Sequence, residues 1–99
     1  MPIQLARGTK EKIDVLVIDN SATPLTDLTG HSPRYDVVNP SNTAVYTNQA
    51  ATNTTMTIEC LIDTTLAGFS ADGQYLLWVQ FDYSPESPKL GPIPFYVGP

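Results

Sequence analysis

The segment 72–83 constrains the fold more than any other part of the chain; it reads Asp-Gly-Gln-Tyr-Leu-Leu-Trp-Val-Gln-Phe-Asp-Tyr. An Asp-Gly turn signal opens it, and the apolar run that follows is rich in aromatic residues. Alternate residues divide into two faces, with Tyr75, Leu77 and Val79 on one and Leu76 and Trp78 on the other. This pattern is typical of a central strand in an antiparallel β-sheet.

Five other segments carry strand patterns bounded by turn residues, namely Ile13–Asp19, Pro33–Asn39, Thr43–Thr47, Thr54–Ile62 and Leu90–Val97. Period-two alternation predicts the inward-facing positions, which are Ile13, Val15, Val17, Tyr35, Val37, Met56, Ile58, Cys60, Ile62, Tyr75, Leu77, Val79, Phe81 and Tyr83. Leu28 is predicted to insert into the core, and segment 63–69 to form one helical turn. The sequence therefore predicts a single all-β domain over residues 1–99.

The last predicted strand contains Pro92 and Pro94 in alternate positions. Proline has no N–H to donate to a sheet, so a proline-bearing strand is expected at a sheet edge or paired on one side only. These prolines would also protect that edge from pairing with other chains.

Composition excludes some partners. The formal net charge of −5 disfavours nucleic acid, because phosphate binding needs a basic surface, and Arg7, Lys10 and Lys12 are better explained as a solvated strand edge. No stretch approaches the roughly 20 apolar residues of a membrane span. Residues 1–12 lack the apolar run of a secretory signal, so synthesis in a reducing cytosol is expected.

The inventory of reactive side chains predicts no enzyme. His31 and Cys60 are the only histidine and the only cysteine, so neither a zinc site nor a nucleophile with an activating base is expected. Cys60 falls on the inward face, where a thiol behaves as a small apolar group. We therefore predict no catalytic residue, no cofactor and no metal site.

Several carboxylates fall near predicted strand ends, where loops could gather oxygen ligands for calcium. These are Asp19, Asp27, Asp63, Asp72 and Asp82. They lack the Asp-x-Asp-x-Asp-Gly spacing of a calcium loop, and acidic residues at such places are usually turn formers.

The order of signals along the chain resembles one family. The strand at Ile13–Asp19 leads to Leu-Thr-Asp-Leu-Thr-Gly at 25–30, and a strand with Tyr35 and Val37 follows. An alternating strand ending near Ile62, a turn at Leu66, Gly-Gln-Tyr at 73–75 and a closing strand with Phe95 and Val97 complete the order. Over nearly its whole length the chain looks like the immunoglobulin-like N-terminal domain of phage baseplate upper proteins and related small virion modules.

The resemblance implies an immunoglobulin-like antiparallel β-sandwich of six to seven strands with one short helical turn. It also implies a non-enzymatic virion structural protein, made in the cytoplasm of a bacterial host. In that family the domain usually begins a longer protein, whereas this sequence ends at Pro99, so capsid decoration, neck and baseplate accessory roles all stay open. The Gly-Gln-Tyr sequence favours a tyrosine corner at Tyr75 about as much as an ordinary half-buried strand tyrosine.

Strand parity also predicts a partner surface. Leu16, Ile18, Leu76 and Trp78 all lie on the faces opposite the predicted core positions, and outward apolar groups on a small acidic domain indicate an interface. The partner would be another virion protein or a second copy of the chain in a homo-oligomer. Alternatively, segments 1–5 and 90–95 fold over these residues, or a bulge exchanges the faces.

The rival function is a carbohydrate- or host-surface-binding module. Sugar sites favour exposed aromatic rings beside polar side chains. Trp78 with Gln80 and Asp82, or Tyr46 with Asn48, would supply such a row.

Overall fold

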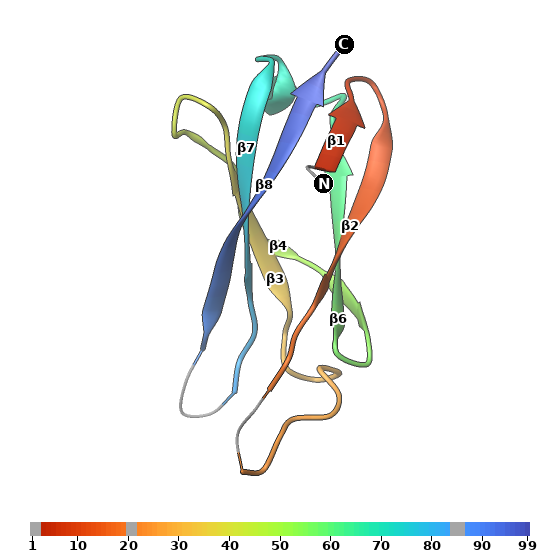
Figure 1. Ribbon diagram of the computed structural model, residues 1–99, viewed down its shortest axis with the longest axis vertical. Helices are drawn as coiled ribbons and strands as arrows, with labels where there is room; N and C mark the ends of the chain where they lie inside the picture. The colour runs from red at the N-terminus through yellow and green to blue at the C-terminus, as the bar shows by residue number, and fades with distance from the viewer. Residues whose placement is uncertain (1–2, 20–21, 84–86) are drawn as a thin grey trace.

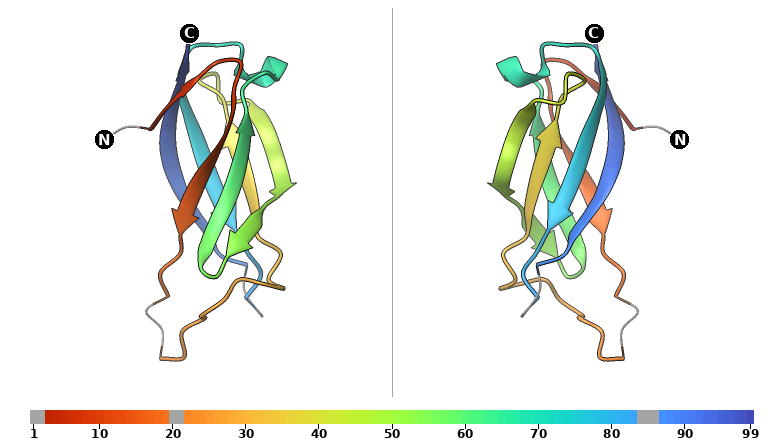
Figure 2. Two further views of the ribbon diagram at one scale, coloured as in Figure 1. Left: turned by 90° about the vertical axis from the view of Figure 1, so that its right-hand side faces the viewer. Right: turned by 90° about the vertical axis from the view of Figure 1, so that its left-hand side faces the viewer.

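The computed structural model describes residues 3–19, 22–83 and 87–99. Its elements, in chain order, are β1 (Ile3–Ala6), β2 (Lys10–Leu16), β3 (Arg34–Val38), β4 (Ala44–Ala50), β5 (Thr52–Thr54), β6 (Thr57–Asp63), the 3₁₀ helix η1 (Ala67–Phe69), β7 (Gly73–Gln80) and β8 (Lys89–Gly98). The strands form two sheets that pack face to face in an elongated body of 44 × 22 × 22 Å (Figure 1; Figure 2).

The five-stranded sheet has the order β1-β8-β7-β3-β4, and the three-stranded sheet has the order β2-β6-β5. All neighbouring strands are antiparallel except β1 and β8, which run parallel. With β1 added at the edge, these are the G-F-C-C′ and B-E-D orders of an immunoglobulin-like sandwich, so the predicted fold class is confirmed. The described residues contain eight strands rather than six or seven, because the short strands β1 and β5 were not predicted.

The core lies where strand parity placed it. Of the predicted inward positions, Val15, Met56 and Tyr83 are partly buried and the others are buried. Leu28 is also fully buried, and Phe69 from η1 fills one end of the sandwich among the rings of Tyr46, Tyr75 and Phe95. The two sheets therefore enclose one continuous apolar core.

Tyr75 forms the tyrosine corner that was one of the two alternatives for this position. Its ring is fully buried and stacks on Phe95 with 5.6 Å between ring centroids. Its hydroxyl donates a hydrogen bond of 2.7 Å to the carbonyl oxygen of Ala71, four residues upstream. The corner fixes the turn that leads from η1 into β7.

Removing the Tyr75 hydroxyl isolates the contribution of this corner. We expect Tyr75→Phe to lower the free energy of unfolding by about 1 kcal/mol, the usual net value of one hydrogen bond. Tyr83→Phe is the matched control, because the Tyr83 hydroxyl donates to the Thr23 carbonyl at an exposed position. Urea unfolding would measure both variants, and equal effects would contradict a special role for the corner.

Several predicted strand limits were wrong, for local reasons. The first long strand begins at Lys10 and ends at Leu16, instead of running over Ile13–Asp19. The predicted strand Thr54–Ile62 is interrupted by a turn at Thr55, whose φ of 49° breaks the extended backbone. Thr54 consequently belongs to β5, and the long strand of this hairpin begins at Thr57.

The proline-bearing strand β8 lies between β7 and β1, so the expectation of an edge strand is wrong for the strand as a whole. Pairing with β1 begins at Phe95 and continues to Gly98. Pro92 and Pro94 precede this segment, where β7 is the only neighbouring strand among the described residues. The expectation of pairing on one side therefore holds for the part that contains the prolines.

Candidate functional site

The structure divides the four predicted interface residues into two pairs. Leu16 and Ile18 are 65% and 72% exposed and lie at and just beyond the end of β2, in the three-stranded sheet. Leu76 and Trp78 are half-buried and lie on the outer face of β7, in the five-stranded sheet. The two pairs lie on different sheets and so do not form one continuous surface. The alternation of residues along a strand assigns a side chain to the outside of the sandwich, but it does not say to which of the two sheets the strand belongs.

The larger apolar group surrounds Leu76. Its cross-strand neighbours are Val38 on β3 and Pro94 on β8, and Tyr96 lies opposite Gln74 on the same face. With Trp78, these apolar residues form what we call the Trp78 face: Val38, Leu76, Trp78, Pro94 and Tyr96. The face is partly exposed: Val38, Leu76 and Trp78 are half-buried, whereas Pro94 and Tyr96 are exposed, Tyr96 to 40%.

Charged groups hold Trp78 in place. The Lys89 ammonium lies 5.7 Å from the centroid of the indole ring, within cation–π range. The same ammonium is 2.8 Å from a carboxylate oxygen of Asp36, the cross-strand neighbour of Trp78.

Gly91 has a φ of 136° and lies against the ring, so a Cβ there would approach the indole to 3.2 Å and the Leu77 carbonyl to 2.8 Å. A substitution of this glycine would displace Trp78.

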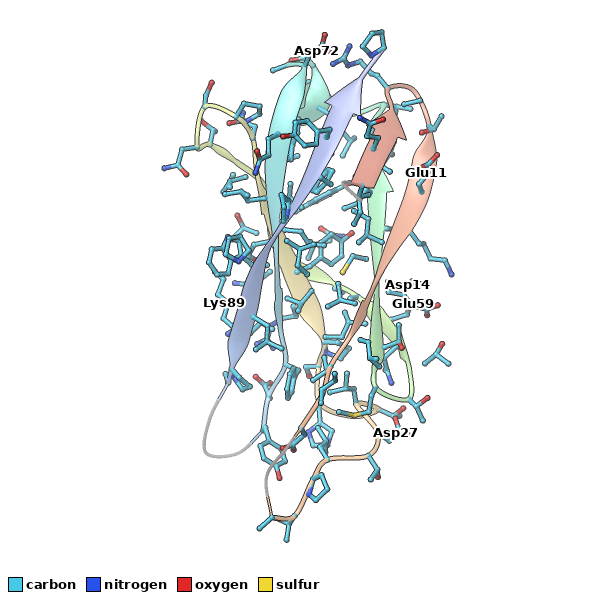
Figure 3. The ribbon with its side chains drawn as sticks, in the orientation of Figure 1. Glu11, Asp14, Asp27, Glu59, Asp72 and Lys89 are labelled. Carbon is cyan, nitrogen blue, oxygen red and sulfur yellow. The ribbon has the colours of Figure 1, made fainter. Side chains whose placement is uncertain are left out.

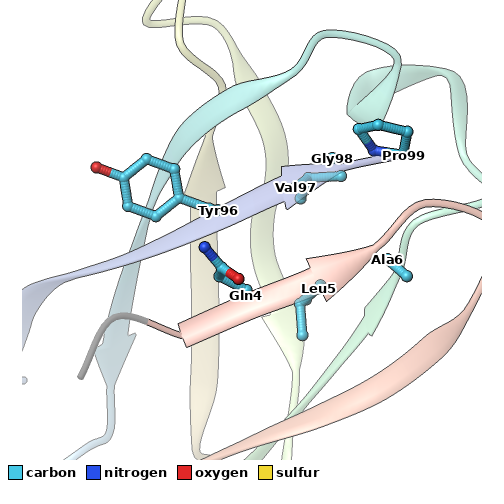
Figure 4. Close-up of a pocket in the computed structure, with 7 residues that line it drawn as sticks. All are labelled: Gln4, Leu5, Ala6, Tyr96, Val97, Gly98 and Pro99. Carbon is cyan, nitrogen blue, oxygen red and sulfur yellow. The ribbon is translucent and has the colours of Figure 1, made fainter.

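Two shallow depressions border the Trp78 face. One, of about 310 Å³, lies beside Val38 and Leu76 and extends over Pro40. The other, of about 470 Å³, follows the parallel strands β1 and β8 past Gln4 and Tyr96 (Figure 4). Both are open to solvent, which favours a broad protein contact over an enclosed small-molecule site.

The ends of the chain, the alternative cover for this face, are strands of the same sheet in the structure. β8 lies beside β7 and β1 lies beside β8, and of these strands Lys89 and Gly91 of β8 pack against the Trp78 ring. Residues 1–2 lie outside the described residues.

The two predicted sugar-binding rows differ in their geometry. Trp78 and Gln80 lie along the outer face of β7, and the Asp82 carboxylate beyond them already accepts hydrogen bonds from Arg34, at 3.1 and 3.3 Å, and from Ser87 at 2.9 Å. The Arg34 guanidinium accordingly lowers the pKa of Asp82. In the other row, the Tyr46 ring is partly buried and packs against Tyr35 and Phe69, which reduces the surface it presents for stacking.

The single histidine and the single cysteine do not come together. His31 contacts the carbonyl oxygen of Asp82 through Nδ1 at 2.7 Å, in the loops at one end of the sandwich. Cys60 is fully buried on β6, and burial raises the pKa of its thiol to about 12. A thiol in this state is a packing group and a poor nucleophile.

Two of the loop carboxylates, Asp27 and Asp63, act as turn formers, whereas Asp72 and Asp82 pair with Arg7 and Arg34. Asp27 accepts a hydrogen bond from the backbone N–H of Thr29, and Asp63 accepts one from the N–H of Thr65. The bond from Thr29 lowers the pKa of Asp27, and the bonds from the Thr65 hydroxyl and backbone N–H lower the pKa of Asp63. In the described part of the chain, no group of three or more histidine, cysteine or acidic side chains has the geometry to hold a metal ion.

Comparisons of the chain with family models, with curated proteins and with solved structures find no match. Among the described residues, no helix has the length and apolar character to cross a membrane.

Proposed function

We propose that this chain is a non-enzymatic structural protein of a bacterial virus particle, which docks onto a neighbouring virion protein through the Trp78 face. The order of its sequence signals, which resembles that of phage baseplate modules, supports the virion role. The observation that carries the docking role is the apolar Trp78 face on the outer side of the five-stranded sheet. Figure 3 shows Lys89, which lies against Trp78, on the side of the sandwich opposite Asp14 and Glu59.

Docking would depend on shape and apolar complementarity. Trp78 and Tyr96 provide large rigid side chains, and such residues contribute most of the binding energy in protein interfaces. The Lys89–Asp36 ion pair beside Trp78 would form part of the polar rim and align the partner. Capsid, neck and baseplate positions all agree with this geometry.

The Trp78→Ala substitution tests the docking role. We expect it to reduce binding of the purified domain to particles of the virus that encodes it by about tenfold or more, since removing an interface hot spot costs about 2 kcal/mol. Thermal stability should change little, because Trp78 lies outside the buried core. Binding would be followed by co-sedimentation with particles and stability by thermal unfolding.

Leu66→Ala is the matched control, because Leu66 is 42% exposed and lies in the turn before η1, away from the Trp78 face. Normal docking of Trp78→Ala together with a large fall in melting temperature would show that Trp78 serves the fold alone. Absence of the chain from purified particles would contradict the virion role. Binding of the isolated domain to host glycans, without binding to particles, would favour the sugar-binding alternative.

A further inference from the structure

Edges of β-sheets are places where another chain can add a strand, and the four edge strands of this sandwich differ greatly. β1 has four residues and β5 has three. β4 has seven, but its pairing with β3 shifts register and Asn48 has a φ of 49°. β2 also has seven residues and pairs with β6 without any shift, so it is the one long and regular edge among the described strands.

The edge of β2 is open because the preceding strand belongs to the other sheet. β1 pairs with β8, which leaves β6 as the only strand beside β2 in the described structure. Figure 2 (left) shows β2 at the border of the three-stranded sheet. A second strand could therefore lie alongside β2.

Hydrogen bonds to β6 identify the backbone groups that point toward this open edge. The Val17 N–H donates to the Met56 carbonyl, and the Thr9 carbonyl accepts from the Thr64 N–H. In an antiparallel pair such bonds recur at every second residue. Odd-numbered residues of β2 consequently bond to β6, and even-numbered residues direct their N–H and C=O groups outward.

These outward groups restrict how a second β2 can pair with the first. With antiparallel strands related by a two-fold axis, only even-numbered residues can face one another in hydrogen-bonded pairs. The register centred on Ile13 places Lys10 opposite Leu16 and Lys12 opposite Asp14, and it pairs the whole strand. The adjacent allowed registers place Lys12 opposite Lys12, or Asp14 opposite Asp14, which is unfavourable.

Asp14 gives an independent reason to expect a cation from a second chain beside the open edge of β2. It lies directly opposite Glu59 on the outer face of the three-stranded sheet, as seen in Figure 3, and like charges in such pairs are destabilising. The Lys12 ammonium is 3.2 Å from Glu59, whereas Asp14 forms no ion pair within the described residues. A lysine at position 12 of a neighbouring chain would neutralise Asp14.

We propose that β2 pairs with β2 of a second copy of this chain, antiparallel about a two-fold axis at Ile13, so that two three-stranded sheets join into one six-stranded sheet. Lys12 and Asp14 form two symmetric ion pairs across the junction. The aliphatic part of Lys10 covers Leu16, whose side chain is 65% exposed in the single chain. The pairing gives a specific geometry to the homo-oligomer expected from the sequence, goes beyond the proposed docking role, and leaves the Trp78 face free.

Charge reversal tests the register. Lys12→Glu and Asp14→Lys each place like charges opposite one another, and each should raise the dissociation constant of the dimer about tenfold or more. An equimolar mixture of the two variants restores opposite charges at both pairs and should form a mixed dimer. Light scattering after size exclusion would measure the mass against the 10.8 kDa of one chain.

Lys89→Glu is the matched control for Lys12→Glu, since it makes the same change in net charge on the opposite sheet and should leave the dimer intact. Circular dichroism would establish that each variant is folded. Failure of two folded variants to associate when mixed would overturn the proposed register.

Amide hydrogen exchange of the unmodified chain gives a test that needs no variant. In the dimer, the N–H groups of Lys10, Lys12, Asp14 and Leu16 should exchange more slowly as protein concentration rises. A chain that stays monomeric at millimolar concentration, or a dimer in which these four amides are unaffected, would contradict edge pairing. Either result would leave docking through the Trp78 face intact, whereas a β2-paired dimer that never binds particles would contradict the virion role alone.

Discussion

Replacing Phe69 by alanine is expected to lower the free energy of unfolding by about 3–5 kcal/mol. The side chain is fully buried, and its ring centroid lies 5.1 Å from that of Tyr75 and 5.8 Å from that of Tyr46. Truncation would leave a cavity between rings that cannot move together, because each is anchored by its own strand. For a domain of this size, the melting temperature should fall by about 12 °C or more.

Two comparisons test the reason given for this effect. Leu66→Ala changes an exposed residue of the same turn and should alter stability by no more than about 0.5 kcal/mol. Phe69→Leu retains much of the apolar volume and should lie between the two. Equal stability of the Phe69→Ala and Leu66→Ala proteins in urea unfolding would show that η1 does not close the core.

The second large effect is expected at Leu28, where alanine should cost about 2–5 kcal/mol. Leu28 belongs to the loop between β2 and β3, yet it is fully buried. Its N–H donates to the Thr55 carbonyl at 2.9 Å, and its carbonyl accepts from the His31 N–H at 3.0 Å. These bonds hold the loop so that the side chain enters the core, and truncation would also release the loop.

Leu28→Met, which nearly conserves volume, should cost less than about 1.5 kcal/mol. Leu25→Ala in the same loop is a further comparison, since Leu25 is only partly buried. Guanidinium unfolding would measure all three variants. A Leu28→Ala protein as stable as Leu25→Ala would mean that this loop contributes nothing to the core.

Much of this fold could be predicted because burial in a sandwich has a period of two residues. The inward positions of β6 and β7 follow directly from the alternation of Ile58, Cys60 and Ile62 and of Tyr75, Leu77 and Val79. Leu28 and Tyr75 were also recognisable, because each follows a local turn signal. Both signals, the alternation of apolar residues and the turn residues before Leu28 and Tyr75, can be read from a few neighbouring positions in the sequence.

The arrangement of the strands between the two sheets could not be predicted in the same way. β1 is short, and its place beside β8 depends on a partner more than 90 residues away in the chain, as the pairing of Ile3 with Phe95 illustrates. The alternation around Leu16 is as clear as that around Leu76, but parity gives no sheet assignment. The strand order therefore divides the predicted interface between two surfaces.

The parallel pairing of β1 with β8 has a mechanical consequence. Tension applied through the segments before β1 and after β8 pulls these two strands in opposite directions along their length. The hydrogen bonds between them are then loaded in shear and share the force, instead of opening one after another as they would in a hairpin pulled from its open end. A domain connected in this way resists extension at its termini more strongly than its small core would imply.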